Sequence, residues 1–217
     1  NRTTGEKLYD STLYYDPVGN GAIAPGTARN RQLTVQLPNG SSGAGNLQVI
    51  VTANVYGSQY EGNAPDNNTQ SALFSSSLAL YPDLQVTGLT ITNAQLQSGA
   101  VVGIRWNDSN SGNGPVNEFF NDRVQVINQT TTTTLISKLV AYDTSAAPVA
   151  AGQSVPREFS FTVPDGLAGV GVLEIRITAD INNDIFEFQG AGNAENNNTS
   201  SITAASALAQ YADLSAT

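Results

Sequence analysis

The sequence predicts an all-β protein of tandem antiparallel β-sandwiches, the first of which is incomplete at its N-terminal side. Three observations carry this prediction: segments in which apolar and polar residues alternate, turn signals at short intervals, and a stretch of sequence that occurs twice. Such alternation places one face of a strand in a core and the other in solvent. The sequence shows no apolar stripe with the 3.6-residue period of an amphipathic helix.

The expected strands and turns follow one another along the chain. Strands are expected where residues alternate or β-branched residues predominate, at 84–91, 101–107, 122–128, 157–163 and 173–179. Turns are expected at 37–40 (LPNG) and 163–166 (VPDG), because Pro presets φ and Gly accepts a positive φ. The polar stretch 107–114 (NDSNSGNG) is expected to be a flexible loop.

Two parts of the chain are related by an internal repeat. Residues 33–40 (LTVQLPNG) align with residues 159–166 (FSFTVPDG) at an offset of 126 residues, 159 minus 33. Extra residues in the second copy then change the offset to 130, at which residues 81–84 (YPDL) align with residues 211–214 (YADL). One period is therefore about 130 residues, 211 minus 81.

This period predicts three segments. Residues 1–81 would be the C-terminal part of a first β-sandwich repeat, residues 82–210 a complete repeat, and residues 211–217 the start of a next repeat. The first repeat would then lack its counterpart of roughly 82–127, which would precede Asn1.

The second repeat resembles a known domain family in the order of its short motifs. These motifs are YPDL at 81–84, NDRV at 121–124, VPDG at 163–166, an acidic hairpin with Glu187, and NNN at 196–198. Their order is similar to that of the bacterial cell-adhesion-related domain (CARDB), well over residues 82–200 and in part over residues 15–70. The resemblance implies an immunoglobulin-like sandwich that occurs in tandem in large exported bacterial proteins, with roles in spacing, adhesion or assembly.

Composition excludes several classes of function. Nine Lys plus Arg against eighteen Asp plus Glu give a net charge of −9, which disfavours binding to nucleic acid or anionic lipid. The chain has no apolar run of about 18 residues, so we expect no membrane insertion. Cys and His are absent, which removes disulfides, thiolate metal sites and the commonest general base. We therefore expect no enzyme, and the resemblance implies an extracellular location at the bacterial cell surface.

An acidic hairpin is a candidate calcium site. The hairpin ADINNDIFEFQG groups four oxygen-bearing side chains, Asp180, Asn182, Asp184 and Glu187. Ca²⁺ takes six to eight oxygen ligands, but the same residues also suit a hairpin in which Asn and Asp form turns. Because Asn54 stands in the first repeat where Asp180 stands in the second, the calcium interpretation applies to the second repeat alone.

Trp106 and Asp108 are candidate ligand-binding residues. Trp106 is the only Trp, and its position in the strand VVGIRWN, opposite in parity to Arg105, suits a core residue or a sugar-stacking platform. Asp108 is the only acid in NDSNSGNG. That stretch has the composition of a cation loop, without the spacing and terminal Glu of an EF-hand loop.

Three functions remain compatible with the sequence. The predicted one is a non-catalytic structural or adhesion module of a large secreted or surface-displayed bacterial protein, which acts with neighbouring repeats as a stalk or fibre unit. A second is a filament subunit joined head to tail to identical subunits by β-strand complementation, with Tyr81, Leu84, Tyr211 and Leu214 as assembly residues. A third is a carbohydrate- or protein-binding accessory module, which requires an exposed Trp or Tyr platform.

Overall fold

The computed structural model describes residues 1–62, 67–92, 95–145, 147–190 and 192–214. The chain divides into two units, unit 1 at Asn1–Ala79 and unit 2 at Leu80–Thr217. Regular structure in both units consists of strands apart from short helical turns, so the all-β prediction is confirmed. None of the described helices has the length and hydropathy that crossing a membrane would require.

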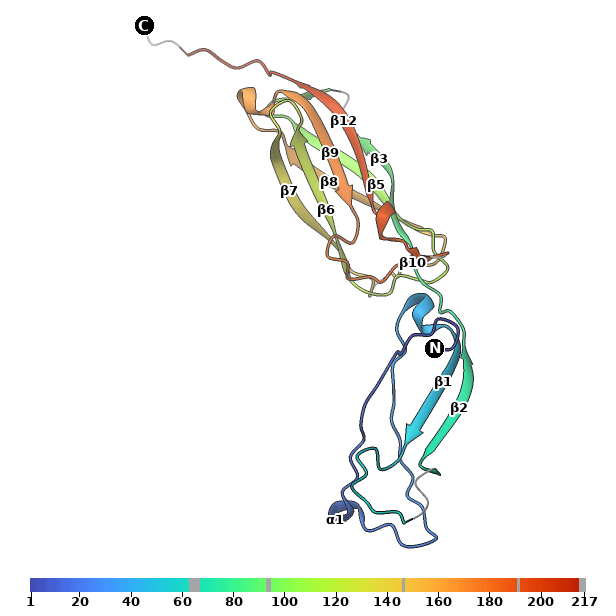
Figure 1. Cartoon of the computed structure of the whole chain (residues 1–217). Helices are drawn as coiled ribbons and strands as arrows, with labels where there is room; N and C mark the ends of the chain where they lie inside the picture. Colours follow the sequence, from blue (N-terminus) through green and yellow to red (C-terminus); the bar gives the residue numbers. More distant parts are fainter. Residues whose placement is uncertain (63–66, 93–94, 146, 191, 215–217) are drawn as a thin grey trace. The chain divides into compact units, whose positions relative to one another are not determined.

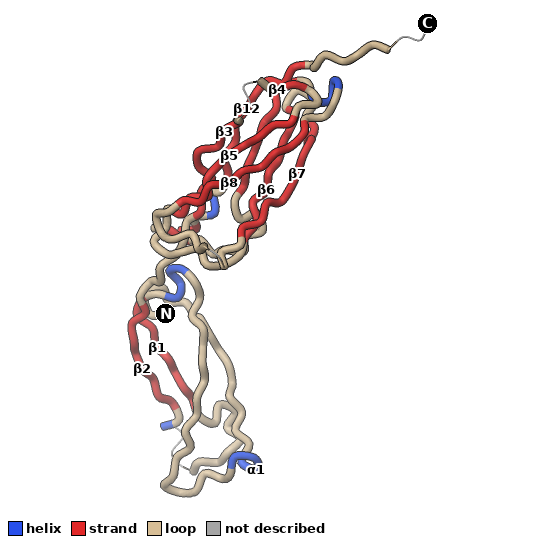
Figure 2. The backbone as a smooth tube through the Cα atoms, turned by 180° about the vertical axis from the view of Figure 1, so that it is seen from behind, coloured by secondary structure: helices blue, strands red, loops and turns tan. Residues whose placement is uncertain are grey.

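Unit 2 is a sandwich of two sheets that lie face to face (Figures 1 and 2). Its strands are β3 (Leu84–Ile91), β4 (Leu96–Gln97), β5 (Val101–Asn110), β6 (Phe120–Asn128), β7 (Thr133–Tyr142), β8 (Ser154–Thr162), β9 (Gly171–Thr178), β10 (Phe188–Gln189), β11 (Gly192–Asn193) and β12 (Thr199–Ala207). One sheet has the order β4-β12-β9-β6-β7 and the other the order β3-β5-β8, while β10 and β11 form a small hairpin. Among the described ladders, β4 pairs with β12 in parallel and the others are antiparallel.

The core of unit 2 lies between these two sheets. One apolar cluster joins the inward side chains of β5 in one sheet with those of β6 and β9 in the other, among them Val102, Ile104, Trp106, Val124, Val126, Leu173, Ile175 and Ile177. A smaller cluster consists of Leu84, Val116, Phe120, Val149 and Ile185. The alternation seen in the sequence of β5 and β6 is therefore the alternation of buried and less buried side chains along these strands.

Strand β5 is longer than the sequence suggests. The loop expected at 107–114 begins later, because β5 continues to Asn110. Its last polar side chains are buried but bonded: Arg157 Nη1 donates to Asp108 Oδ2 over 2.6 Å, and Asn110 Nδ2 donates to the Val149 carbonyl over 3.0 Å. The loop prediction is wrong for these residues because their partners are distant in sequence.

Unit 1 contains fewer paired strands. Its elements are α1 (Pro17–Asn20), the 3₁₀ turn η1 (Gly40–Gly43), β1 (Gly45–Thr52) and β2 (Thr69–Ser76). Strands β1 and β2 pair antiparallel over their whole lengths, and Figure 2 draws most of the remaining unit as loop. The short helix α1 begins after Asp16, whose carboxylate accepts hydrogen bonds from two amides of its first turn.

The β1–β2 ladder has the same register as the β9–β12 ladder of unit 2. The terminal pairs are Gly45 with Ser76 and Thr52 with Thr69 in unit 1, and Gly171 with Ser206 and Thr178 with Thr199 in unit 2. A 3₁₀ turn precedes each ladder, η1 in unit 1 and η3 (Gly166–Gly169) in unit 2, and a further turn, η4 (Glu195–Asn197), precedes β12.

Each of the turns η1 and η3 ends in a glycine, because a backbone carbonyl occupies the space that a side chain would need there. A Cβ on Gly43 would lie 2.0 Å from the Pro38 carbonyl oxygen, and one on Gly169 would lie 2.1 Å from the Pro164 carbonyl oxygen.

Candidate metal centre

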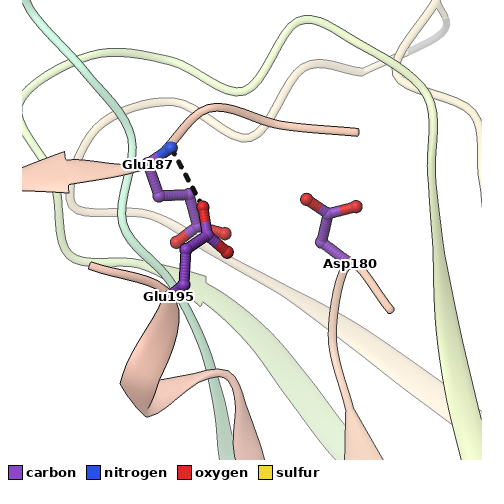
Figure 3. Close-up of side chains that lie close together, drawn as sticks. All are labelled: Asp180, Glu187 and Glu195. Atoms are coloured by element: carbon purple, nitrogen blue, oxygen red, sulfur yellow. Dashed lines mark hydrogen bonds between the residues drawn. The ribbon is translucent and has the colours of Figure 1, made fainter. Parts of the chain in front are cut away.

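Three carboxylates from the segment between β9 and β12 form one cluster (Figure 3). Asp180 follows β9, Glu187 precedes β10, and Glu195 begins η4. One oxygen of each carboxylate lies within 4.8 Å of the others. Asp180 and Glu187 are buried and Glu195 is partly buried, so three acids share a site with little access to water.

Asp180 also closes the turn after β9. Its φ is 43°, and its carboxylate accepts hydrogen bonds from the amides of Asp184 and Ile185 over 2.9 and 2.8 Å. Its counterpart in unit 1, Asn54, has a φ of 50° and accepts from the Gln59 amide over 3.1 Å. The turn therefore explains why residue 180 has a side-chain oxygen. It does not explain why that residue is charged, because the neutral amide of Asn54 accepts a similar hydrogen bond in unit 1.

Glu187 connects this hairpin to the first strand of unit 2. Its Oε2 accepts from the Leu84 amide over 2.5 Å, and its Oε1 accepts from Asn198 Nδ2 over 3.0 Å. The same Nδ2 donates to Glu195 Oε2 over 3.3 Å, and the Glu187 amide donates to Glu195 Oε1 over 3.4 Å (Figure 3). Asn198 Oδ1 is buried and has no hydrogen-bond partner among the described residues.

The electrostatics of the cluster disfavour three negative charges. Burial raises the pKa of Glu187 from its ordinary 4.5 to about 8; the Leu84 amide opposes this shift, and the neighbouring Glu195 adds to it. Burial is also the largest cause of the raised pKa of Asp180 and of Glu195. A divalent cation would neutralise the repulsion, and carboxylate oxygens are the ligands that Ca²⁺ prefers.

The structure groups some of the residues proposed from the sequence and separates others. Asp180 and Glu187 belong to the cluster, whereas Asn182 and Asp184 are exposed and hydrogen-bond to each other over 3.3 Å. Sequence reasoning missed Glu195, which η4 carries back towards the hairpin. Its position directly before the run of asparagines at 196–198 is the one local signal that points to it.

Trp106 and Asp108 lie inside the sandwich in a buried charge cluster. Trp106 is 1% exposed, and its Nε1 donates to Asp108 Oδ1 over 3.0 Å and to Asp122 Oδ2 over 3.2 Å. Arg157 Nη1 lies 2.6 Å from Asp108 Oδ2 and 3.4 Å from Asp122 Oδ2. Neither Trp106 nor Asp108 is open to a ligand in this arrangement.

Burial makes the two carboxyl groups of this cluster easier to protonate. Burial and the nearby Asp108 raise the pKa of Asp122 to about 8, although Arg157 opposes the shift. Burial also raises the pKa of Asp108, again against the effect of Arg157. Both carboxyl groups are therefore protonated more readily than an exposed aspartate, in spite of the neighbouring guanidinium.

The four residues expected at the repeat junctions have different surroundings. Tyr81 packs edge-on against Phe186 with ring centroids 5.1 Å apart, and Leu84 is fully buried in the smaller apolar cluster. Tyr211 is half exposed, and Leu214 is almost fully exposed. The last three residues of the predicted next repeat lie outside the described part of the chain.

Solved structures similar to this chain include CARDB domains. The CARDB domain of a Pyrococcus furiosus protein, in complex with di-metal ions, matches 59% of this chain and 96% of its own with 19% identity and a TM-score of 0.40. A domain of a Methanosarcina acetivorans protein named for the cell surface matches 58% of this chain and 92% of its own, with 17% identity and a TM-score of 0.37. The expected resemblance to CARDB is thereby confirmed as a structural match over about 60% of the chain.

Other comparisons add little. β-Glucosidase 3B from Thermotoga neapolitana, in complex with glucose, matches 60% of this chain but 18% of its own, with 11% identity and a TM-score of 0.32. No protein-family profile matches the sequence, and no curated protein matches it either. At such low identities the likeness concerns the fold alone.

Proposed function

We propose that the protein is a non-catalytic repeat module of a larger secreted or surface-displayed protein, in which β-sandwich repeats follow one another as a stalk or fibre. The observation that carries this proposal is the recurrence, in unit 1, of the ladder register and side-chain contacts of unit 2. Strands β1 and β2 stand 126 and 130 residues before β9 and β12, 171 minus 45 and 199 minus 69.

An arginine and a tyrosine make the same contact in both units. The guanidinium of Arg31 lies 5.1 Å from the centroid of the Tyr15 ring, and that of Arg157 lies 5.1 Å from the centroid of the Tyr142 ring. Each pair combines a cation with the face of an aromatic ring. The contact links segments that are distant in sequence, so chance similarity of composition does not explain it.

An asparagine holds the end of the 3₁₀ turn in both units. Asn1 Nδ2 donates to the carbonyl oxygens of Ser42 in η1 and of Ala44 just after it, over 2.9 and 2.8 Å. Asn128 Nδ2 donates to those of Ala168 in η3 and of Val170 just after it, over 3.3 and 2.9 Å. These contacts serve to build a fold rather than to bind a ligand. They support the interpretation of unit 1 as the later part of the repeat that unit 2 contains in full.

Calcium is the ion we propose for this module, at Asp180, Glu187 and Glu195 of unit 2. Its support is the cluster of three carboxylates, two of them buried, whose oxygens lie within 4.8 Å of one another. In unit 1 the counterparts of Asp180 and Glu187 are Asn54 and Glu61, so one of these two charges is absent there. The ion would hold the hairpin against β3 and stiffen one end of the repeat.

The test is to find the protein in its native source with antibodies raised against unit 2. We expect a polypeptide well above the 22.7 kDa of this chain, and labelling of intact cells or of the culture medium. Antibody that has been absorbed with the purified protein is the control. A polypeptide near 22.7 kDa found only inside cells would contradict the proposal.

A further inference from the structure

We propose that unit 1 binds a further β-strand, which pairs antiparallel with the open edge of β1, continues its apolar face and brings a carboxylate to Arg31. The inference rests on the proposed function, in which the two units are repeats of one module, and it adds which kind of partner unit 1 binds. That partner is a strand of the β6 type, apolar at alternate positions and acidic near its start.

The open edge of β1 is the first observation. In unit 2, β9 lies between β12 and β6, and residues 123–128 of β6 pair with residues 173–178 of β9. In the described part of unit 1, β1 pairs with β2 and with no other strand. Residues 47–52 therefore present an edge of backbone groups, which is a template for another strand.

The apolar face of β1 is the second observation. Val49 and Val51 are 48% and 63% exposed, whereas their counterparts Ile175 and Ile177 are 0% exposed. In unit 2 these isoleucines belong to the core cluster, together with side chains from β6. β6 lies beside β9 in the same sheet, so a β6-type strand next to β1 would continue this apolar face with its own apolar side chains.

Arg31 supplies the charge that the partner must match. Its counterpart Arg157 forms ion pairs with Asp108 of β5 and Asp122 of β6. Arg31 donates to the Tyr14 carbonyl over 2.9 Å, but among the described residues it has no ion pair with a carboxylate. A strand in the place of β6 would bring an acidic residue to this guanidinium.

The segments of unit 1 without regular structure are also consistent with a missing β6-type strand. In unit 2, β7 pairs with β6, and β8 pairs with β5. Their counterparts in unit 1, residues 6–15 and 28–36, are not strands. Segments of strand-like sequence lose their ladders when the strands that they pair with are absent.

A second folded copy does not supply this strand. Its own β6 lies between β7 and β9 of its unit 2, so the edges of β6 are already paired. The occupant is therefore a strand with the chemistry of β6 whose own edges are unpaired. Pairing of β1 with β1 between two copies is one outcome that the experiment detects.

The experiment adds a peptide with the sequence of residues 120–127 (FNDRVQVI) to the 217-residue protein. In the repeat register this peptide ends just before the position of Asn1, so the two do not overlap. We expect it to slow hydrogen exchange at the amides of residues 47–52. A peptide with Asp122→Asn should bind about tenfold more weakly, because it lacks the carboxylate that forms an ion pair with Arg157 in unit 2.

Variants of the protein test the role of the charge. With Arg31→Met, the acidic and the neutral peptide should bind alike. Arg29→Met, which removes a nearby exposed arginine, is the matched control and should keep the tenfold preference.

Three results would overturn the inference. The first is unchanged exchange of β1 both with the free peptide and with the same eight residues joined covalently in front of Asn1. The second is equal binding of the acidic and neutral peptides to the unmodified protein. The third is protection of β1 that grows with protein concentration without peptide, because a second copy would then occupy the edge. None of these depends on the size or location of the native protein, so the proposed function is tested separately.

Discussion

At the scale of single residues, Arg157 joins the buried charges of unit 2 to its aromatic side chains. Its guanidinium pairs with Asp108 and Asp122 and lies 5.8 and 5.1 Å from the ring centroids of Trp106 and Tyr142. A buried ion pair that loses one partner leaves a charge without compensation, which costs far more than the loss of an exposed pair. The Arg157 side chain therefore supports the fold of unit 2.

Arg157→Met should destabilise unit 2 by roughly 3–5 kcal/mol, because two buried carboxyl groups lose their cation. Urea unfolding followed by the fluorescence of Trp106, the only Trp of the chain, measures the change. The matched control is Arg105→Met on the same strand as Trp106, where an exposed pair with Glu158 spans 3.7 Å. That control should cost less than about 1 kcal/mol, and equal effects of the two substitutions would refute this account.

At the scale of elements, the segment between β9 and β12 has an unusual dependence on pH when no cation is bound. The pKa of Glu187 is about 8 in the folded protein and 4.5 ordinarily. A group whose pKa rises on folding stabilises the fold fully below its unfolded pKa. The contribution of Glu187 is therefore greatest below about pH 4.5, and it is lost as the pH rises to about 8.

Calcium binding should strengthen over the same range of pH, because the ion requires Glu187 to be ionised. We expect isothermal titration calorimetry to show tighter binding at pH 8 than at pH 6. Glu195→Gln should weaken the affinity by at least about tenfold, because affinity follows the charge of the ligands. Asp184→Asn, an exposed position outside the cluster, should leave it nearly unchanged.

These two variants separate the site seen in the structure from the site expected from the sequence. If Asp184→Asn weakened binding as much as Glu195→Gln, the hairpin itself would be the ligand set. Absence of any calcium-dependent heat at pH 8 would remove the ion from the proposal and leave the carboxylates a purely structural role.

The sequence predicts elements well where local patterns decide them. It places β3 at the residues where the structure has it, and it identifies β9 from its alternation. It fails at 107–110, where distant residues such as Arg157 and Val149 hold polar side chains within a strand. Glu195 was missed for the same reason, because a turn distant from Asp180 in sequence brings it into the cluster.

At the scale of the whole molecule, the two units have similar two-stranded ladders, but the strands and side chains that surround these ladders differ. In unit 2, β9 has a strand on each side and a core on one face, whereas β1 has a paired strand on one side among the described residues. Local stability in proteins follows such differences in burial and pairing. The two units therefore provide an internal comparison of one ladder with and without its neighbours.

Amide hydrogen exchange should reveal this difference directly. The amides of β1 should exchange roughly a hundredfold or more faster than the amides at the same repeat positions of β9, because β1 opens without disrupting a two-sheet core. Mass spectrometry of peptic fragments from the two strands measures both rates in one sample. Similar protection of β1 and β9 would mean that unit 1 is closed by contacts other than strand pairing.

The glycines that end η1 and η3 bear on how such a chain changes over generations. In the proposed repeat, aligned positions elsewhere differ between the two units: Asn54 aligns with Asp180 and Val49 with Ile175. At Gly43 and Gly169 any side chain would collide with a backbone carbonyl. These two positions therefore do not tolerate substitution by another residue. These two positions are landmarks by which further copies of the unit would be recognised in a longer sequence, even after most of their other residues had been replaced.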